Sequence, residues 1–234
     1  MFGLNKKING GDTRAFRQET GGAWGGYKTN MVEGLASGLV TGTWVATQHG
    51  WRPVQSVTEG DTVLTFDNGA QEVRSVTRGV LWQGGDKCPH NKLPLMVPAG
   101  ALGNQADMIL LAEQCVMLES DTADAIFGDP FAVLMSSHLE GYRGISRAMP
   151  HKTVEIYQLH FDDDQMVYST GGALVFCPSL KVYNVAELLA ARPQAAPYTA
   201  LSADEAAMLV ECLINEEAVD VTDAAFDPRY AACA

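Results

Sequence analysis

Cysteine, histidine and aspartate are the side chains of this sequence that could do chemistry, and their spacing limits what that chemistry can be. The cysteines are odd in number and never stand as Cys-x-x-Cys, the spacing typical of zinc and dithiol sites. They are Cys88, Cys115, Cys177, Cys212 and Cys233. Cys88-Pro89-His90 offers only two ligands in a loop, and Asp162-Asp163-Asp164 lacks the following Gly and Glu of an EF-hand loop. The sequence therefore predicts no metal and no cofactor.

The elements that would position a reactive group begin in residues 38–78. Three runs rich in β-branched and aromatic residues alternate there with turn signals; they are Val40–Thr47, Val54–Val57 and Thr62–Phe66. The turn Asp67-Asn68-Gly69 contains Asn-Gly, a strong hairpin signal because both residues tolerate positive φ. Further along, Glu155–Phe161 alternates between apolar and polar residues, which predicts a strand. The expected fold class is all-β.

The same stretch resembles the start of the Hint (Hedgehog/intein) domain, in the bacterial form with a single Hint module. That family opens with Cys-x-x-x-Gly-Thr, a strand and a glycine turn, then Pro-Val, a Gly-Asp turn and Val-x-Thr-x-Asp. The matching positions are Gly42-Thr43, Gly50, Pro53-Val54, Gly60-Asp61, Val63, Thr65 and Asp67. Similar segments follow at 93–103, 107–118 and 162–172, so the resemblance spans about residues 38–178. It implies a horseshoe of β-hairpins.

Four positions of this resemblance lack the reactive group that the family carries. The nucleophilic cysteine is replaced by Gly38, a Ser or Thr by Leu111, the first histidine by Gln114, and a second histidine by Asp164. In the family's reaction a thiol attacks the preceding carbonyl and a histidine protonates the leaving nitrogen. Glycine cannot attack, and glutamine cannot move a proton near neutral pH. The resemblance thus implies that self-processing is lost.

Four further residues remain candidates for a residual reaction: Ser37, Thr43, Cys115 and His138. Ser37 lies one residue before the expected nucleophile, but a slip of one residue in a strand turns a side chain to the opposite face. By the same reasoning Cys115 would face away from the family's pocket, and it is expected to be a buried free cysteine. His138 is expected to be a structural histidine, because the resemblance places it at a hairpin where a histidine is frequent without being the proton donor. The alternative to lost activity is intramolecular autoproteolysis through an N-to-O or N-to-S acyl shift.

Composition limits the compartment and the partners. The chain has 234 residues, 47% of them hydrophobic and 19% charged, as expected for one globular domain with attachments. Its net charge is −12, with +3 in residues 1–30 and −6 in residues 181–234. An acidic body repels nucleic acid and anionic membranes, so neither is an expected partner. With no signal peptide or long apolar run, we expect a soluble protein that is cytoplasmic, exported by a leaderless route, or part of a larger particle.

The two ends of the chain differ from its middle. Residues 1–34 are glycine-rich, and Trp24 and Tyr27 are expected to anchor this arm on the body or on a partner. Asn184–Glu187 predicts a short helix that ends at Arg192-Pro193. The capping box Ser202–Glu205 predicts a second helix. Its apolar stripe would pack on the body or dock into a partner protein; the stripe comprises Ala206, Leu209, Val210, Leu213 and Ile214.

We therefore expect three parts: a glycine-rich arm at 1–34, a Hint-like β domain at 35–180, and an acidic helical tail at 181–234. The fold class is an all-β, Hint-like horseshoe with a short helical C-terminal appendage. The function that the sequence favours is a catalytically degenerate Hint domain, retained as a structural or protein-binding module in a secreted or particle-type assembly.

Overall fold

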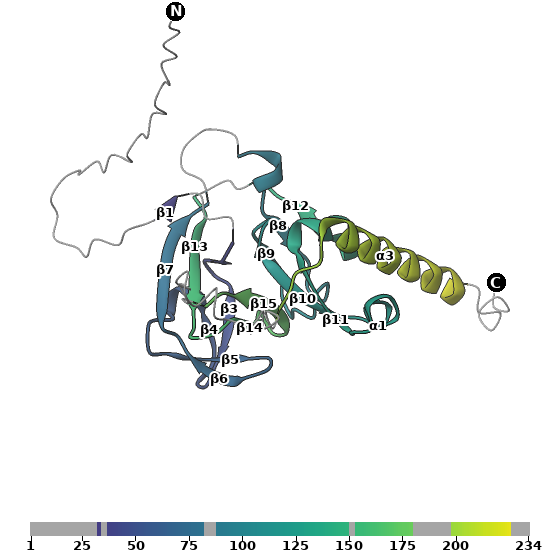
Figure 1. Ribbon diagram of the computed structural model, residues 1–234. Coiled ribbons are helices and arrows are strands. Elements are labelled where there is room, and N and C mark those ends of the chain that lie inside the picture. Colours follow the sequence, from purple (N-terminus) through teal and green to yellow (C-terminus); the bar gives the residue numbers. More distant parts are fainter. Residues whose placement is uncertain (1–31, 34–36, 82–87, 150–152, 180–197, 226–234) are drawn as a thin grey trace, which may run out of the picture.

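Short strands make up most of the fold (Figure 1). The computed structural model describes residues 32–33, 37–81, 88–149, 153–179 and 198–225. The first sheet has, in spatial order, β1 (Val32–Glu33), β7 (Ser75–Val80), β13 (Glu155–His160), β2 (Leu39–Val40), β9 (Met108–Leu110), β8 (Leu95–Val97) and β12 (Ser146–Arg147). The second has β11 (Phe131–Met135), β10 (Cys115–Glu119), β15 (Ala173–Cys177), β14 (Gln165–Ser169), β3 (Trp44–Thr47), β5 (Thr62–Thr65) and β6 (Gly69–Glu72), with β4 (Gly50–Pro53) paired to β3. The all-β prediction is confirmed.

Helical segments are few among these residues. Two are α-helices, α1 (Asp121–Phe127) and α3 (Ala203–Ala225). Four are 3₁₀ turns: η1 (Val54–Ser56), η2 (His90–Lys92), η3 (Ser136–Leu139) and η4 (Tyr142–Gly144). Among the described helices, none is both long and apolar enough to cross a membrane.

The strands expected near the start of the domain are present with two corrections. The run Val40–Thr47 is not one strand, because a turn at Thr41-Gly42 separates β2 in the first sheet from β3 in the second. Gly69 adopts φ +62 in the turn between β5 and β6, as the Asn-Gly signal predicts. The run Val54–Val57, however, is not a strand. Pro53 ends β4, and the N–H of Val57 then donates to the carbonyl of Val54, which closes the 3₁₀ turn η1. Val54 and Val57 are fully buried, so their apolar character serves the core rather than a strand.

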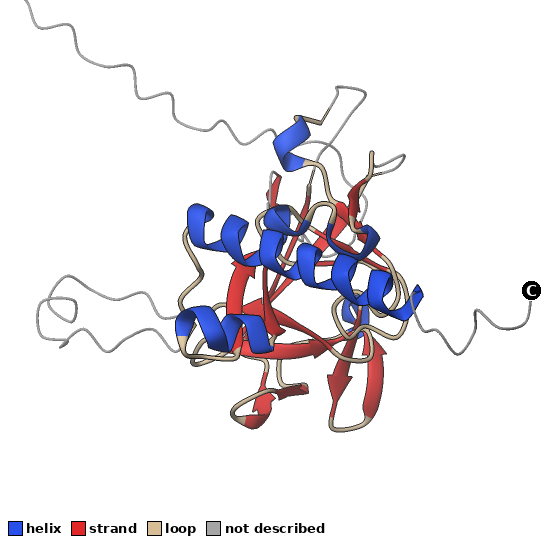
Figure 2. Cartoon of the chain, turned by 90° about the vertical axis from the view of Figure 1, so that its right-hand side faces the viewer, coloured by secondary structure: helices blue, strands red, loops and turns tan. Residues whose placement is uncertain are grey.

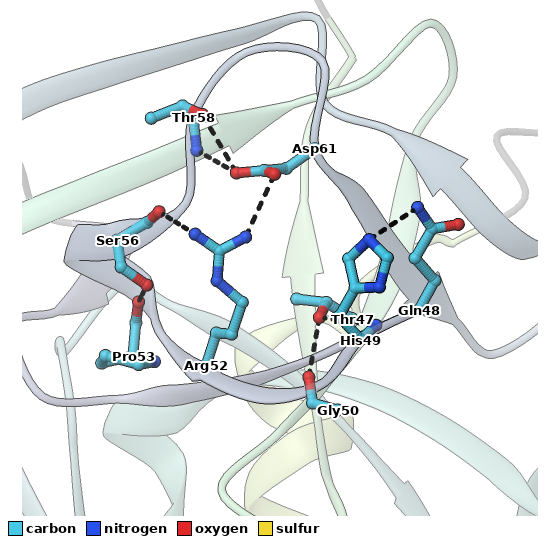
Figure 3. A network of polar contacts seen from close by, with 9 residues as sticks. All are labelled: Thr47, Gln48, His49, Gly50, Arg52, Pro53, Ser56, Thr58 and Asp61. Carbon is cyan, nitrogen blue, oxygen red and sulfur yellow. Dashed lines mark hydrogen bonds and ion pairs between the residues drawn. The ribbon is translucent and has the colours of Figure 1, made fainter.

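A polar network fixes the connection between β4 and β5 (Figure 3). Arg52 donates from Nη1 to Asp61 Oδ1 at 3.1 Å and from Nη2 to the carbonyl of Ser56. Asp61 Oδ2 accepts the backbone N–H of Thr58 at 2.7 Å and its hydroxyl at 3.0 Å. These bonds, that of the Thr58 N–H foremost, lower the pKa of Asp61 below its ordinary value. The Gly60-Asp61 motif thus holds a turn in place.

The core lies between the two sheets and continues under α3. Figure 2 shows α3 crossing one side of the strands beside α1. The predicted capping box is present: Glu205 Oε2 accepts the N–H of Ser202 at 2.9 Å, and the hydroxyl of Ser202 accepts the N–H of Glu205 at 3.4 Å. The apolar stripe packs on the body through Ala206, Leu209, Val210 and Leu213, whereas Ile214 is 39% exposed.

Several predictions lie outside the described residues. They are residues 1–31 of the glycine-rich arm with Trp24 and Tyr27, the helix at Asn184, the linker after it, and the last residues of the tail. The end of the expected arm, Val32–Glu33, is instead the strand β1 and pairs with β7. The boundaries of the three expected parts remain predictions as well.

Candidate functional site

The position expected to hold a nucleophile is occupied by a glycine in a conformation that excludes side chains. Gly38 lies just before β2 with φ +126, a value that residues with a side chain rarely adopt. A Cβ atom built on it would lie 2.7 Å from Cγ2 of Ile156 and 2.9 Å from Cγ of Gln158. It would also lie 3.1 Å from the carbonyl oxygen of Tyr157. The strand β13 therefore fills the space that a cysteine would need.

Gln114, at the position expected to hold a proton donor, instead joins three segments of the chain. Its Oε1 accepts the N–H of Gly38 at 2.6 Å. Its Nε2 donates to the carbonyls of Phe176 at 2.8 Å and Cys115 at 2.9 Å. The side chain is buried, and a buried amide with its donors and acceptor satisfied is a rigid structural group. The structure thus brings Gly38 and Gln114 together, as the resemblance implies.

Leu111 and Asp164 do not join this pair at the cavity described below. Leu111 is fully buried in a small apolar cluster with Val40, Leu81 and Ile156. Its backbone carbonyl accepts a hydrogen bond from the hydroxyl of Ser136 at 2.5 Å. The backbone at residue 111 is therefore fixed by Ser136, because leucine has no polar side chain of its own to do so. Asp164 Oδ1 accepts the N–H of Ser179 at 2.8 Å and ties the β13–β14 turn to the chain after β15.

A cavity of about 280 Å³ adjoins Gly38 and Gln114. Its wall includes Ser37, Cys115, Gln158 and Cys177, together with apolar residues of β13 and β15. Gln158 Nε2 donates to both the carbonyl and the hydroxyl oxygen of Ser37, at 3.1 and 3.2 Å. Among the described residues that line this cavity there is no histidine. The serine has the amide of Gln158 beside it, and the carboxylate in the wall, Glu113, is paired with Lys92.

The two thiols of this cavity are poor nucleophiles. Burial raises the pKa of Cys115 above its ordinary value and raises that of Cys177 to about 12. A thiol must ionise to attack, so both groups stay protonated near neutral pH. Cys177 and Gln158 were not singled out in the sequence. The sequence indicates the strand Glu155–His160 but does not indicate which residues this strand contacts, so it gave only a weak signal for a role at this cavity.

Thr43 and His138 do not line this cavity. Thr43 is buried just before β3, and its backbone carbonyl accepts the N–H of Val54. His138 belongs to η3, between β11 and the turn that leads to η4. Across the described ranges, no three His, Cys, Asp or Glu side chains cluster in a way that could hold a metal ion.

The sequence matches the Hint domain family over residues 37–175, and the chain belongs to that family. The solved structures that are similar to this chain include three inteins or intein-like domains. One is a bacterial intein-like domain from Clostridium thermocellum, at 14% identity and a TM-score of 0.42, and the match covers 59% of this chain and 97% of that one. Another is a splice-inactive variant of the AceL NrdHF class 3 split intein, at 11% identity and a TM-score of 0.41, with 62% of this chain and 99% of that one covered. The gp41-1 intein matches at 14% identity and a TM-score of 0.38, with 61% of this chain and 98% of that one covered. No curated protein matches the sequence. The Hint-like fold expected from the resemblance is confirmed.

Proposed function

We propose that this chain is a Hint domain that has lost self-processing and serves as a structural or protein-binding module in a secreted or particle-type assembly. One observation carries the proposal: Gly38 has neither a nucleophilic side chain nor room for one. A nucleophile and a proton donor act as a unit, so the absence of both removes the acyl shift and not merely part of its rate.

The hydrogen bonds around Gly38 support the same conclusion. Gln114 orients the N–H of Gly38, a group that a histidine would otherwise protonate or polarise, and it does so through an oxygen that carries no proton. The scaffold contacts that hold a scissile bond in the family thus hold an inert peptide here.

A second candidate function is autoproteolysis through Ser37, which lines the same cavity. An N-to-O shift would need the hydroxyl of Ser37 to lose its proton as it attacks the carbonyl of the preceding residue. The hydroxyl instead accepts a hydrogen bond from Gln158, and the two cysteines that line the same cavity have raised pKa values. We therefore favour the inert module.

Intact-mass spectrometry separates the two functions. The purified protein is incubated alone, with hydroxylamine, which cleaves esters and thioesters, or with dithiothreitol, which cleaves thioesters. A lost reaction leaves the 25.1 kDa chain unchanged in every sample. Fragments ending near residues 36–38 would contradict the proposal, and their disappearance in Ser37→Ala would establish the serine route.

The double variant Gly38→Cys/Gln114→His tests whether the missing groups alone account for the loss. We expect no cleavage, because the new side chain at residue 38 meets Ile156 and the carbonyl of Tyr157. Cleavage by a folded double variant would show that β13 leaves room for a working nucleophile and would overturn this reason for inactivity.

A further inference from the structure

A second cavity, of about 360 Å³, lies where the chain crosses from β2 in the first sheet to β3 in the second. It shares no lining residue with the cavity at Gly38. Its volume falls within the range of about 300–1,000 Å³ that is common for ligand sites. The chain therefore has a second hollow, independent of the vestigial site.

One wall of this second cavity is apolar and open to solvent. Trp44 is 47% exposed and Met96 is 37% exposed, and the half-buried Ile109 pairs with Met96 across β8 and β9. Large apolar side chains exposed around a hollow are typical of binding surfaces, and tryptophan is enriched among residues that carry binding energy. Such a wall suits an aliphatic or aromatic group of a ligand.

One carboxylate lines the cavity, and a second lies beside a lining residue. Asp107 belongs to the lining and anchors itself by accepting the N–H of Ala99 at 2.9 Å through Oδ1. Glu155 does not line the cavity, but its Oε2 lies 3.5 Å from the hydroxyl of the lining residue Thr41. Among the described residues that line the cavity there is no lysine or arginine, and the chain carries a net charge of −12. The field at the mouth of the cavity therefore favours a cation.

We propose that this cavity binds an arginine side chain from an extended basic segment of a partner protein. Arginine combines an aliphatic stem, which fits against Met96 and Ile109, with a planar cation that stacks on an indole and pairs with carboxylates. The guanidinium would lie over Trp44, with Asp107 and Glu155 as its counter-charges. The inference rests on the proposed binding-module function and names its partner chemistry.

The test uses the full chain and a fluorescent peptide, Gly-Ser-Gly-Arg-Gly-Ser-Gly, with fluorescence anisotropy as the readout. A second peptide carries norleucine in place of arginine and so keeps the aliphatic stem without the charge. We expect saturable binding of the arginine peptide and no binding of the norleucine peptide. Trp44→Ala should weaken that binding about tenfold, and Asp107→Asn about threefold.

Trp51→Ala is the matched control. Trp51 is 43% exposed on the neighbouring strand β4 but does not line the cavity, so its loss should leave the affinity within about twofold. Trp44→Leu keeps an apolar side chain without an aromatic face, and it should bind as weakly as Trp44→Ala. It serves as the measured variant if the alanine variant does not fold.

Three results would overturn the inference. They are equal binding of the norleucine peptide, an unchanged affinity in the folded Trp44 variant, and tighter binding of a synthetic peptide of residues 1–31, which would make the chain's own basic segment the occupant. An intact mass measured on the same preparation keeps this test separate from that of the proposed function. An uncleaved protein without arginine binding refutes only the present inference.

Discussion

Replacing Gly38 by alanine should destabilise the fold through two separable effects. The first is backbone strain, because φ +126 suits glycine and costs other residues about 1–3 kcal/mol. The second is overpacking of the new methyl group against Ile156 and Gln158, which costs about 1–3 kcal/mol in a packed interior. The expected loss in the free energy of unfolding is therefore about 2–6 kcal/mol.

Urea denaturation followed by circular dichroism measures this loss, and Gly42→Ala is the matched control. Gly42 has φ +92, but an added Cβ would meet no atom within 4 Å, so its alanine variant carries strain without crowding. We expect Gly38→Ala to lose at least about 1 kcal/mol more than Gly42→Ala. Equal losses would refute the claim that β13 occupies the space of the missing nucleophile.

Three further predictions concern Gln114, His160 and the helix α3. Gln114→Ala should cost about 2–3 kcal/mol in urea denaturation, because it leaves the N–H of Gly38 and the carbonyl of Phe176 without their partner. A result below about 0.5 kcal/mol would show that water replaces the amide. Burial lowers the pKa of His160, so the unfolded chain takes up the proton first, and stability should fall as the pH drops below about 6.5. His160→Gln should reduce this loss between pH 7.5 and 5, and an unchanged pH dependence would contradict the assignment. Leu209→Ala should cost about 2–5 kcal/mol and Met208→Ala, at an exposed neighbour, less than about 0.5, as measured by thermal unfolding; similar values would show that α3 does not pack as described.

The helix α3 and the glycine-rich arm remain the predicted partner surfaces. Three of the four helix residues expected to meet a partner, Leu209, Val210 and Leu213, are buried within the chain itself. A partner of this helix would therefore meet Ile214 and Met208, which are 39% and 44% exposed. The cavity at Trp44 offers a surface that the apolar pattern of the helix did not suggest.

Local chemistry made some elements predictable. The Asn-Gly turn after β5, the alternating strand β13 and the capping box at Ser202 each depend on side chains close in sequence, and each is present. The 3₁₀ turn η1 was missed because an apolar run has the same composition in a strand and in a buried turn. The helix α1 was missed as well, because seven residues are too few to show a clear helical period. Its signals were the caps, Ser120 at the start and Gly128 at the end.

The sequence by itself determined which groups are absent: no sulfur at Gly38 and no imidazole at Gln114. Only the tertiary structure decided what those absences mean. The crowding at Gly38 comes from β13, more than a hundred residues away in the chain, and the amide of Gln114 reaches Gly38 across 76 residues. Contacts of this kind depend on how sheets pair and pack, which residue types alone do not specify.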